Sequence, residues 1–273
     1  MRVGPRLHPG LEAVHDEHHA LVAKAASRYA GADLLHRQVR PASLQGPLGV
    51  TRQPLLLCLA LRVVISPYNT PMQADDKRVG LRSRLREEAL VGLFVKLPGF
   101  EVIDCAKNAG FDFVVIDREH SALDERTVLD QIAYGRALGL PALVRLPEVD
   151  VPVIGRLLDA GAAGVQVSDV TKREQVDTLV AATRFPPEGE RGVAPSVRAG
   201  HYGRVPVSEY VHAAPDPLLV IQVERALNRE ELRALLAAPI DVCFIGAVDL
   251  SANMGSTGEL TPDVRGRITA ICD

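Results

Sequence analysis

Short apolar runs alternate with longer amphipathic stretches from about residue 80 to the end of the chain. The apolar runs predict six strands, at residues 90–95, 111–117, 142–146, 164–167, 217–223 and 240–245. Apolar positions at helical spacing predict five connecting helices, at residues 100–108, 124–138, 151–160, 172–183 and 228–237. Strands that alternate with helices in this way indicate βαβ units and a parallel sheet.

The ends of several predicted helices carry residues that stop or start a helix. Asp124 leads one predicted helix and is expected to cap its free N–H groups. Gly110, Gly139 and Gly161 each follow a helix, where a glycine commonly ends it. The strands are apolar on both sides, as expected for a sheet with helices on one face and a packed interior on the other. We therefore predict an α/β fold of the (β/α)8 TIM-barrel type, incomplete, with about six β/α units.

The first 71 residues lack this regular alternation. We expect residues 1–71 to be an N-terminal extension that is poorly structured or results from a misassigned start, because Met72 stands just ahead of the regular region. Residues 72–273 are expected to form the partial barrel. The alternatives are a true extra domain and a substitute strand supplied by the apolar run at residues 55–65.

Composition excludes several classes of protein. Hydrophobic residues make up 47% of the chain and charged residues 24%, and the formal net charge of -3 argues against nucleic-acid binding. The four cysteines form no C-x-x-C pair, so neither a zinc site nor a disulfide framework is indicated. No secretory signal and no membrane-spanning run is visible, and a cytoplasmic protein is expected.

Five consecutive predicted strands carry polar side chains at or just after their carboxyl ends. These residues are Asp117, Arg118, Glu119 and His120; Arg145; Gln166, Ser168 and Asp169; Gln222, Glu224 and Arg225; and, after the sixth strand and Gly246, Asp249 and Ser251. The active site of a (β/α) barrel gathers at the carboxyl ends of its strands. We therefore expect a functional site on this rim.

Glu224 and Asp249 are carboxylates at the ends of adjacent strands. Two like charges brought close repel each other unless a cation lies between them. Hard oxygen ligands without cysteine suit Mg²⁺ or Mn²⁺. The alternative is that Glu224 forms a salt bridge with Arg225 or Arg145.

His120 and Arg145 are candidates for proton transfer and for substrate binding. His120 stands beside Glu119 and Asp117, which suits a general base oriented by carboxylates; the alternative is a helix cap or a loop residue. Arg145 emerges from an apolar strand, and its planar guanidinium suits bidentate binding of a substrate carboxylate. Its alternative is pairing with Asp117 or Glu119. A metal that stabilises an enolate, a base that moves the proton and an arginine that binds the carboxylate are together what the enolisation of a 2-oxoacid requires.

Seven sequence strings in a fixed order resemble the HpcH/HpaI aldolase family, the metal-dependent class II pyruvate aldolases. They are G-L-F-V-K, G-F-D-F-V-V-I-D-R-E-H-S, P-A-L-V-R, L-L-D-A-G-A-A-G-V-Q-V, A-T-R-F-P-P-E-G-E-R-G-V, L-L-V-I-Q-V-E and F-I-G-A-V-D-L-S-A-N-M-G. The resemblance covers residues 80–273. It implies a lyase that cleaves a 4-hydroxy-2-oxoacid to pyruvate and an aldehyde.

The resemblance also implies a role for each site residue. Glu224 and Asp249 would bind Mg²⁺ or Mn²⁺, with Co²⁺ as a further candidate. His120 would be the acid/base residue, supported by Asp117. Pyruvate would be held by Arg145, by Gln222 and by the backbone of Gly246, Ala247 and Val248. The loop at residues 190–192 would border the substrate entrance.

The chain departs from the family pattern in sequence and in length. Ala247 replaces a proline and Ala194 replaces a glycine, and the family continues with two more β/α units beyond Asp273. A homo-oligomer is expected if the chain folds. The rival readings are a citrate-lyase-like or malyl-CoA-lyase-like enzyme and a truncated, inactive remnant.

Overall fold

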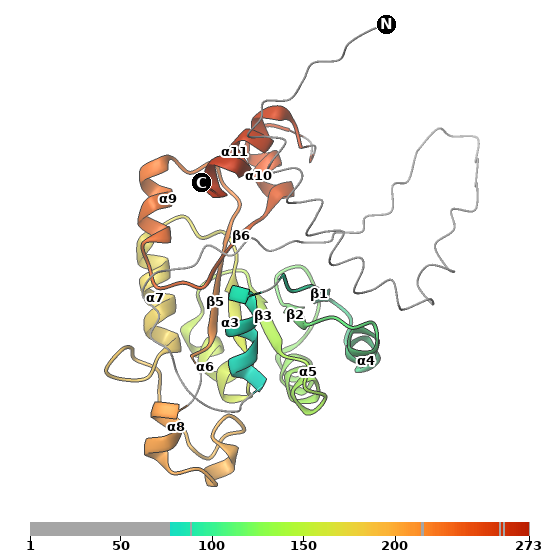
Figure 1. Ribbon diagram of the computed structural model, residues 1–273, viewed down its shortest axis with the longest axis vertical. Coiled ribbons are helices and arrows are strands. Elements are labelled where there is room, and N and C mark those ends of the chain that lie inside the picture. Colours follow the sequence, from blue (N-terminus) through green and yellow to red (C-terminus); the bar gives the residue numbers. More distant parts are fainter. Residues whose placement is uncertain (1–76, 88, 214–215, 257, 259, 273) are drawn as a thin grey trace, which may run out of the picture.

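Helices and parallel strands alternate through the residues that the computed structural model describes, which are 77–87, 89–213, 216–256, 258 and 260–272 (Figure 1). The strands are β1 (Gly92–Val95), β2 (Phe113–Asp117), β3 (Ala142–Leu146), β4 (Gly164–Val167), β5 (Leu218–Val223) and β6 (Val242–Ile245). The helices are α3 (Lys77–Glu87), α4 (Glu101–Asn108), α5 (Glu125–Ala137), α6 (Val151–Asp159), α7 (Arg173–Thr183), α8 (Val207–Ala213), α9 (Arg229–Leu236), α10 (Ala247–Asn253) and α11 (Pro262–Cys272), with a 3-10 turn at η1 (His201–Gly203). The expected N-terminal extension, 1–71, lies outside the described residues.

All six strands run parallel in one curled sheet, in the order β1-β2-β3-β4-β5-β6. Helices α4, α5, α6, α7 and α9 follow strands β1 to β5 and lie along one side of the sheet (Figure 1). This arrangement confirms the expected α/β fold of an incomplete TIM-barrel type with six β/α units.

Successive residues of each strand point to opposite faces of the sheet. In β2, Val114 and Ile116 enter the main core, which lies between the strands and the helices. Phe113 and Val115 enter a smaller cluster on the inner face, together with apolar residues of β3, β5 and β6. Asp117 continues the inner series at the carboxyl end of β2. The inner face is therefore apolar at the amino ends of the strands and polar at their carboxyl ends.

Helix α3 covers the apolar part of the inner face and was not predicted from the sequence. Leu81 and Leu85 pack into the inner cluster. The Arg82 guanidinium donates to Asp241 over 2.5 Å and to the carbonyl oxygen of Pro217 over 3.1 Å. Charged and small residues dominate this helix, so its apolar stripe is too narrow to stand out as a periodic pattern.

The predicted helix ends are confirmed. The Asp124 carboxylate accepts a 2.7 Å hydrogen bond from the backbone N–H of Thr127. Gly110, Gly139 and Gly161 have φ of 86°, 65° and 98°, a left-handed conformation in which glycine is favoured.

The loop at residues 190–192 lies at the amino ends of the strands, away from the polar end of the inner face. Arg191 pairs over 3.0 Å with Asp159, the last residue of α6, and its guanidinium stacks on Phe185. The backbone N–H of Glu190 bonds to the last part of α7 at Ala181. The described chain therefore does not bring this loop to its own polar rim, and the expectation that the loop borders the substrate entrance stays a prediction. The loop lies at the amino ends of the strands because α7 runs back toward them and the loop follows the last turn of α7.

None of the helices in the described part of the chain is long and apolar enough to cross a lipid bilayer.

Candidate active site

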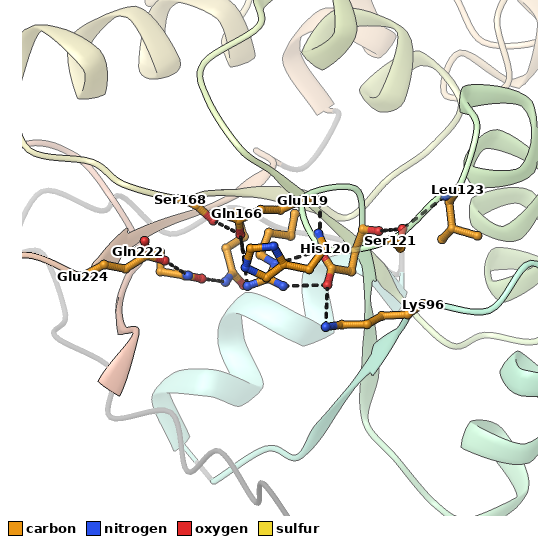
Figure 2. Close-up of polar contacts among 11 residues, drawn as sticks. Lys96, Glu119, His120, Ser121, Leu123, Gln166, Ser168, Gln222 and Glu224 are labelled. Carbon is orange, nitrogen blue, oxygen red and sulfur yellow. Dashed lines mark hydrogen bonds and ion pairs between the residues drawn. The ribbon is translucent and has the colours of Figure 1, made fainter. Parts of the chain in front are cut away.

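A group of polar side chains occupies the inner face at the carboxyl ends of the strands. Figure 2 shows them converging from four places: Lys96 after β1, Glu119 and His120 after β2, Gln166 and Ser168 on and after β4, and Gln222 and Glu224 on and after β5. Arg145 of β3 lies opposite Asp117 of β2 in the sheet register. Period-two alternation brings these residues together, because each occupies an inward position of its strand or directly continues one.

Asp117 and Arg145 form a buried bidentate ion pair. Arg145 Nε lies 2.9 Å from Asp117 Oδ1, and Nη2 lies 2.6 Å from Oδ2. The backbone N–H groups of Glu119 and His120 donate to the same carboxylate over 3.0 and 3.2 Å, and Lys96 Nζ lies 3.4 Å away. Burial raises the pKa of Asp117, but the hydrogen bonds from Arg145 and from these N–H groups outweigh it and lower the pKa to about 2. Asp117 is therefore ionised and fixed at neutral pH.

Glu119 connects this ion pair to the next strand and to the histidine. Its Oε2 atom accepts a 2.6 Å hydrogen bond from Ser168 Oγ and lies 3.1 Å from Arg145 Nη1. His120 Nε2 lies 3.9 Å from the same oxygen, and the imidazole is half-exposed. Asp117 thus supports His120 through the backbone N–H, whereas the carboxylate nearest to the ring nitrogen is Glu119.

Arg145 is oriented by its surroundings on every side. Its guanidinium lies over the Phe94 ring at 4.8 Å from the centroid, a cation–π contact. The pairing with Asp117 and Glu119, which was the alternative to substrate binding, is present. Nη1 lies 3.1 Å from Glu119 Oε2, and because each Nη atom of a guanidinium carries two N–H donors, its second donor is left for a further acceptor.

Two amides and a carboxylate form a chain of hydrogen bonds between β4 and β5. Gln166 Nε2 donates to Gln222 Oε1, and Gln222 Nε2 donates to Glu224 Oε1. Both glutamine side chains are buried. The chain ends on Glu224, which directly follows β5.

Glu224 is in a position that disfavours its negative charge. Burial raises its pKa most; the hydrogen bond from Gln222 opposes this effect, and the nearby charges of Glu119, Asp249 and Asp169 raise the pKa further. A bound cation would offset both the cost of burying the Glu224 charge and its repulsion from the neighbouring carboxylates.

Gly246 leaves the space that Glu224 occupies. A Cβ atom at position 246 would lie 2.6 Å from Glu224 Cγ and 3.2 Å from Oε1, well inside van der Waals contact. Gly246 has a φ of -75°, so the glycine is required for close approach and not for its backbone conformation.

The donor set fits a hard divalent cation. Asp249 lies in the first turn of α10, is exposed, and is near enough for its charge to raise the pKa of Glu224. Within the described residues no cluster of three or more His, Cys, Asp or Glu side chains could hold a metal ion by itself. Two carboxylates leave coordination positions for water and for a chelating substrate, which is how Mg²⁺ is usually bound.

The salt bridges considered for Glu224 do not form. Arg225 instead pairs with both oxygens of Asp169 over 2.6 Å, and Arg145 is held by the residues after β2. Asp169 adopts a left-handed conformation with φ of 48°, which places its carboxylate beside Arg225. Glu224 is thus left without a cationic side-chain partner among the described residues.

Of the three backbone N–H groups expected to bind substrate, one already has an acceptor and two lie at the start of a helix. The Gly246 N–H is already bonded to the carbonyl oxygen of Val223 over 3.0 Å, so it is not free to bind a ligand. Ala247 and Val248 begin α10, where N–H groups have no acceptor within the helix.

The sequence did not point to Lys96, which the structure brings into the site, and it placed Gln166 and Ser168 on the rim without an individual role. Glu119 was expected only as a carboxylate that orients His120. Lys96, Gln166 and Ser168 each fall on the inward series of β1 or β4, and this period-two continuation is the signal that could have placed their side chains on the inner face.

Comparisons with known proteins agree with this geometry. Residues 90–272 match the family model described as HpcH/HpaI aldolase/citrate lyase. A hydroxypyruvate/pyruvate aldolase of Roseobacter denitrificans is 36% identical over 185 residues, which are 66% of this chain and 72% of that protein. A 4-hydroxy-2-oxovalerate aldolase of Rhodococcus jostii is 37% identical over 171 residues, which are 62% of this chain and 65% of that protein.

A solved structure shows the same architecture. The crystal structure of an HpcH/HpaI aldolase from Desulfitobacterium hafniense superposes with a TM-score of 0.66 at 28% identity, covering 70% of this chain and 75% of that chain. The sheet that carries the polar inner face is therefore shared with a structurally characterised protein.

Proposed function

The chain belongs to the HpcH/HpaI aldolase/citrate lyase family, and from this premise we propose that it is a divalent-metal-dependent carbon–carbon lyase. In the cleavage direction it converts a 4-hydroxy-2-oxoacid to pyruvate and an aldehyde. The names of the two similar aldolases support pyruvate as the common product.

Arg145 and Gln222 bind the 2-oxoacid end of the substrate. Arg145 is held rigid by Asp117 and Phe94, and its Nη1 atom, which lies 3.1 Å from Glu119 Oε2, has a second N–H group for a substrate oxygen. Gln222 lies on the neighbouring part of the inner face. A guanidinium that is fixed before the substrate arrives loses little conformational entropy on binding. The N–H groups of Ala247 and Val248 complete the expected contacts to the carboxylate.

Glu224 and Asp249 hold the divalent cation, Mg²⁺ or Mn²⁺, with Co²⁺ as a further candidate. When bound, the cation polarises the 2-oxo group and stabilises negative charge on its oxygen. The raised pKa of Glu224 supports this assignment, because burial and neighbouring carboxylates penalise its charge when no cation is present.

His120 moves the proton. Its imidazole takes the proton of the 4-hydroxyl group, the bond between carbons 3 and 4 breaks, and the electron pair of that bond becomes the pyruvate enolate. The imidazolium of His120 then returns a proton to carbon 3 of the enolate, which gives pyruvate and restores the neutral imidazole, and the other product is the aldehyde. Glu119, 3.9 Å from Nε2, stabilises the imidazolium that forms.

One observation carries the proposal. A buried arginine, a histidine and a crowded carboxylate that lacks a cationic side-chain partner in the described chain lie on one inner face, at the edge where barrels place their chemistry.

A cleavage assay tests the proposal. The chain is incubated with 4-hydroxy-2-oxopentanoate and Mn²⁺, and proton NMR follows the release of pyruvate. We expect release that stops with EDTA and in Glu224→Gln, but persists in Asp177→Asn, which alters an exposed ion pair on α7. A folded chain that releases no pyruvate from this or other 4-hydroxy-2-oxoacids contradicts the proposal.

The family description also includes citrate lyase, so cleavage of citrate or of a malyl thioester is the alternative activity. The same NMR assay with these compounds separates the two readings. We further expect a homo-oligomer located in the cytoplasm, which light scattering and cell fractionation test.

A further inference from the structure

Gln222 connects Gln166 to Glu224 through two hydrogen bonds on the inner face. Gln166 lies on β4 opposite Val220 of β5, two residues before Gln222. Its Nε2 atom reaches diagonally to Gln222 Oε1, and Gln222 Nε2 donates to Glu224 Oε1. Within the described residues, no other side chain donates a hydrogen bond to Glu224.

Only one orientation of the two amides satisfies this chain. An ionised carboxylate accepts hydrogen bonds and donates none, so Gln222 must turn its NH2 group toward Glu224. The carbonyl oxygen of Gln222 then points back to β4, where it needs a donor because the side chain is buried. Gln166 supplies that donor.

Without the Gln166 donor, neither orientation of the Gln222 amide satisfies both its oxygen and Glu224. In the present orientation its carbonyl oxygen would be buried and unpaired. In the flipped orientation it would direct its oxygen at the carboxylate, where the two acceptors repel each other. Either change leaves Glu224 less well held in the position from which it can bind a cation.

We propose that Gln166 is a positioning residue for the metal site, acting through Gln222 on Glu224. The proposal rests on the proposed function in that Glu224 is taken as a metal ligand. Hydrogen-bond partners behind a metal ligand typically change metal affinity by about 10–100-fold. Gln166 stands one residue further back, so we expect about a tenfold effect, the lower end of that range.

Mn²⁺ binding without substrate tests this inference, with free Mn²⁺ measured by electron paramagnetic resonance. Gln166→Met keeps the length of the side chain and removes the donor, and it should weaken Mn²⁺ binding about tenfold. Gln131→Met is the matched control, because Gln131 is equally buried but donates to the carbonyl oxygens of Leu97 and Gly99. Its Mn²⁺ affinity should equal that of the unchanged chain.

A double-mutant cycle shows whether the effect passes through Gln222. In a Gln222→Met background, Gln166→Met should cause no further loss of Mn²⁺ affinity, because the relay is already broken. A full additional tenfold loss would contradict the relay. Gln166→Asn is the milder second variant, should Gln166→Met not fold by circular dichroism.

The outcomes separate this inference from the proposed function. Unchanged Mn²⁺ affinity in folded Gln166→Met and Gln166→Asn, together with loss of binding in Glu224→Ala, would overturn the role of Gln166 and leave the metal site standing. Absence of Mn²⁺ binding by the unchanged, folded chain would overturn both.

Discussion

Replacing Gly246 by alanine should damage the site more than the fold. The new Cβ would lie 2.6 Å from Glu224 Cγ, whereas carbon atoms in contact are separated by about 3.5–4.0 Å. Glu224 must therefore move by about 1 Å, and a misplacement of this size at a reacting centre costs on the order of 100-fold in rate. The overpacking itself should lower the free energy of unfolding by only about 1–3 kcal/mol.

Solvent deuterium exchange into the methyl group of pyruvate, followed by proton NMR with saturating Mn²⁺, measures the rate. Thermal unfolding measures the stability. Gly155→Ala is the control: its added Cβ meets nothing within 4 Å, and it lies inside α6, where alanine is the better helix former. Exchange within twofold of normal in Gly246→Ala, or an equal loss in Gly155→Ala, would refute the argument that Gly246 makes room for Glu224.

Three further predictions concern stability. Arg145→Met should lower the free energy of unfolding by about 3–5 kcal/mol in urea titrations, because it leaves the buried Asp117 charge without its main partner; an unchanged midpoint would count against that. The pKa of Asp117 is about 2 when folded and near 3.9 when unfolded, so its ionised form adds about 2 kcal/mol above pH ~4 that is lost as the pH falls toward ~2. Asp117→Asn should flatten the pH dependence of unfolding in that window, and a slope equal to that of the unchanged chain would contradict the assignment. Asp124→Ala should cost about 1 kcal/mol by removing the cap on Thr127, and calorimetry showing no change would dismiss that cap as a source of stability.

The regular part of the fold could be predicted because its signals are local. Six apolar runs and five amphipathic stretches stand out along the chain, and the glycines and Asp124 mark helix ends through backbone chemistry that acts within a few residues. Helix α3 was missed because its stability comes from contacts distant in sequence, such as Arg82 with Asp241. The short helices α8 and α10 lack enough turns to show a period.

The sequence predicted which residues lie at the polar edge of the sheet, but not which of them form ion pairs and hydrogen bonds with one another. Strand ends identify which residues share an edge, and the direction of each strand fixes the inner face. They do not decide which of several nearby carboxylates an arginine selects. Arg145 takes Asp117 and Glu119, and Arg225 takes Asp169, because side-chain reach and local backbone conformation, such as the left-handed Asp169, determine these pairs.

Deuterium exchange into pyruvate tests the central claim most directly, since it requires no knowledge of the aldehyde. The chain is incubated with pyruvate in D2O with Mn²⁺ or Mg²⁺, then with EDTA, and Glu224→Ala and Asp249→Ala are compared with it. The account predicts exchange that depends on the metal and disappears in both variants. A chain shown to be folded by circular dichroism that nevertheless gives no exchange, or exchange that survives both EDTA and the two substitutions, would contradict it.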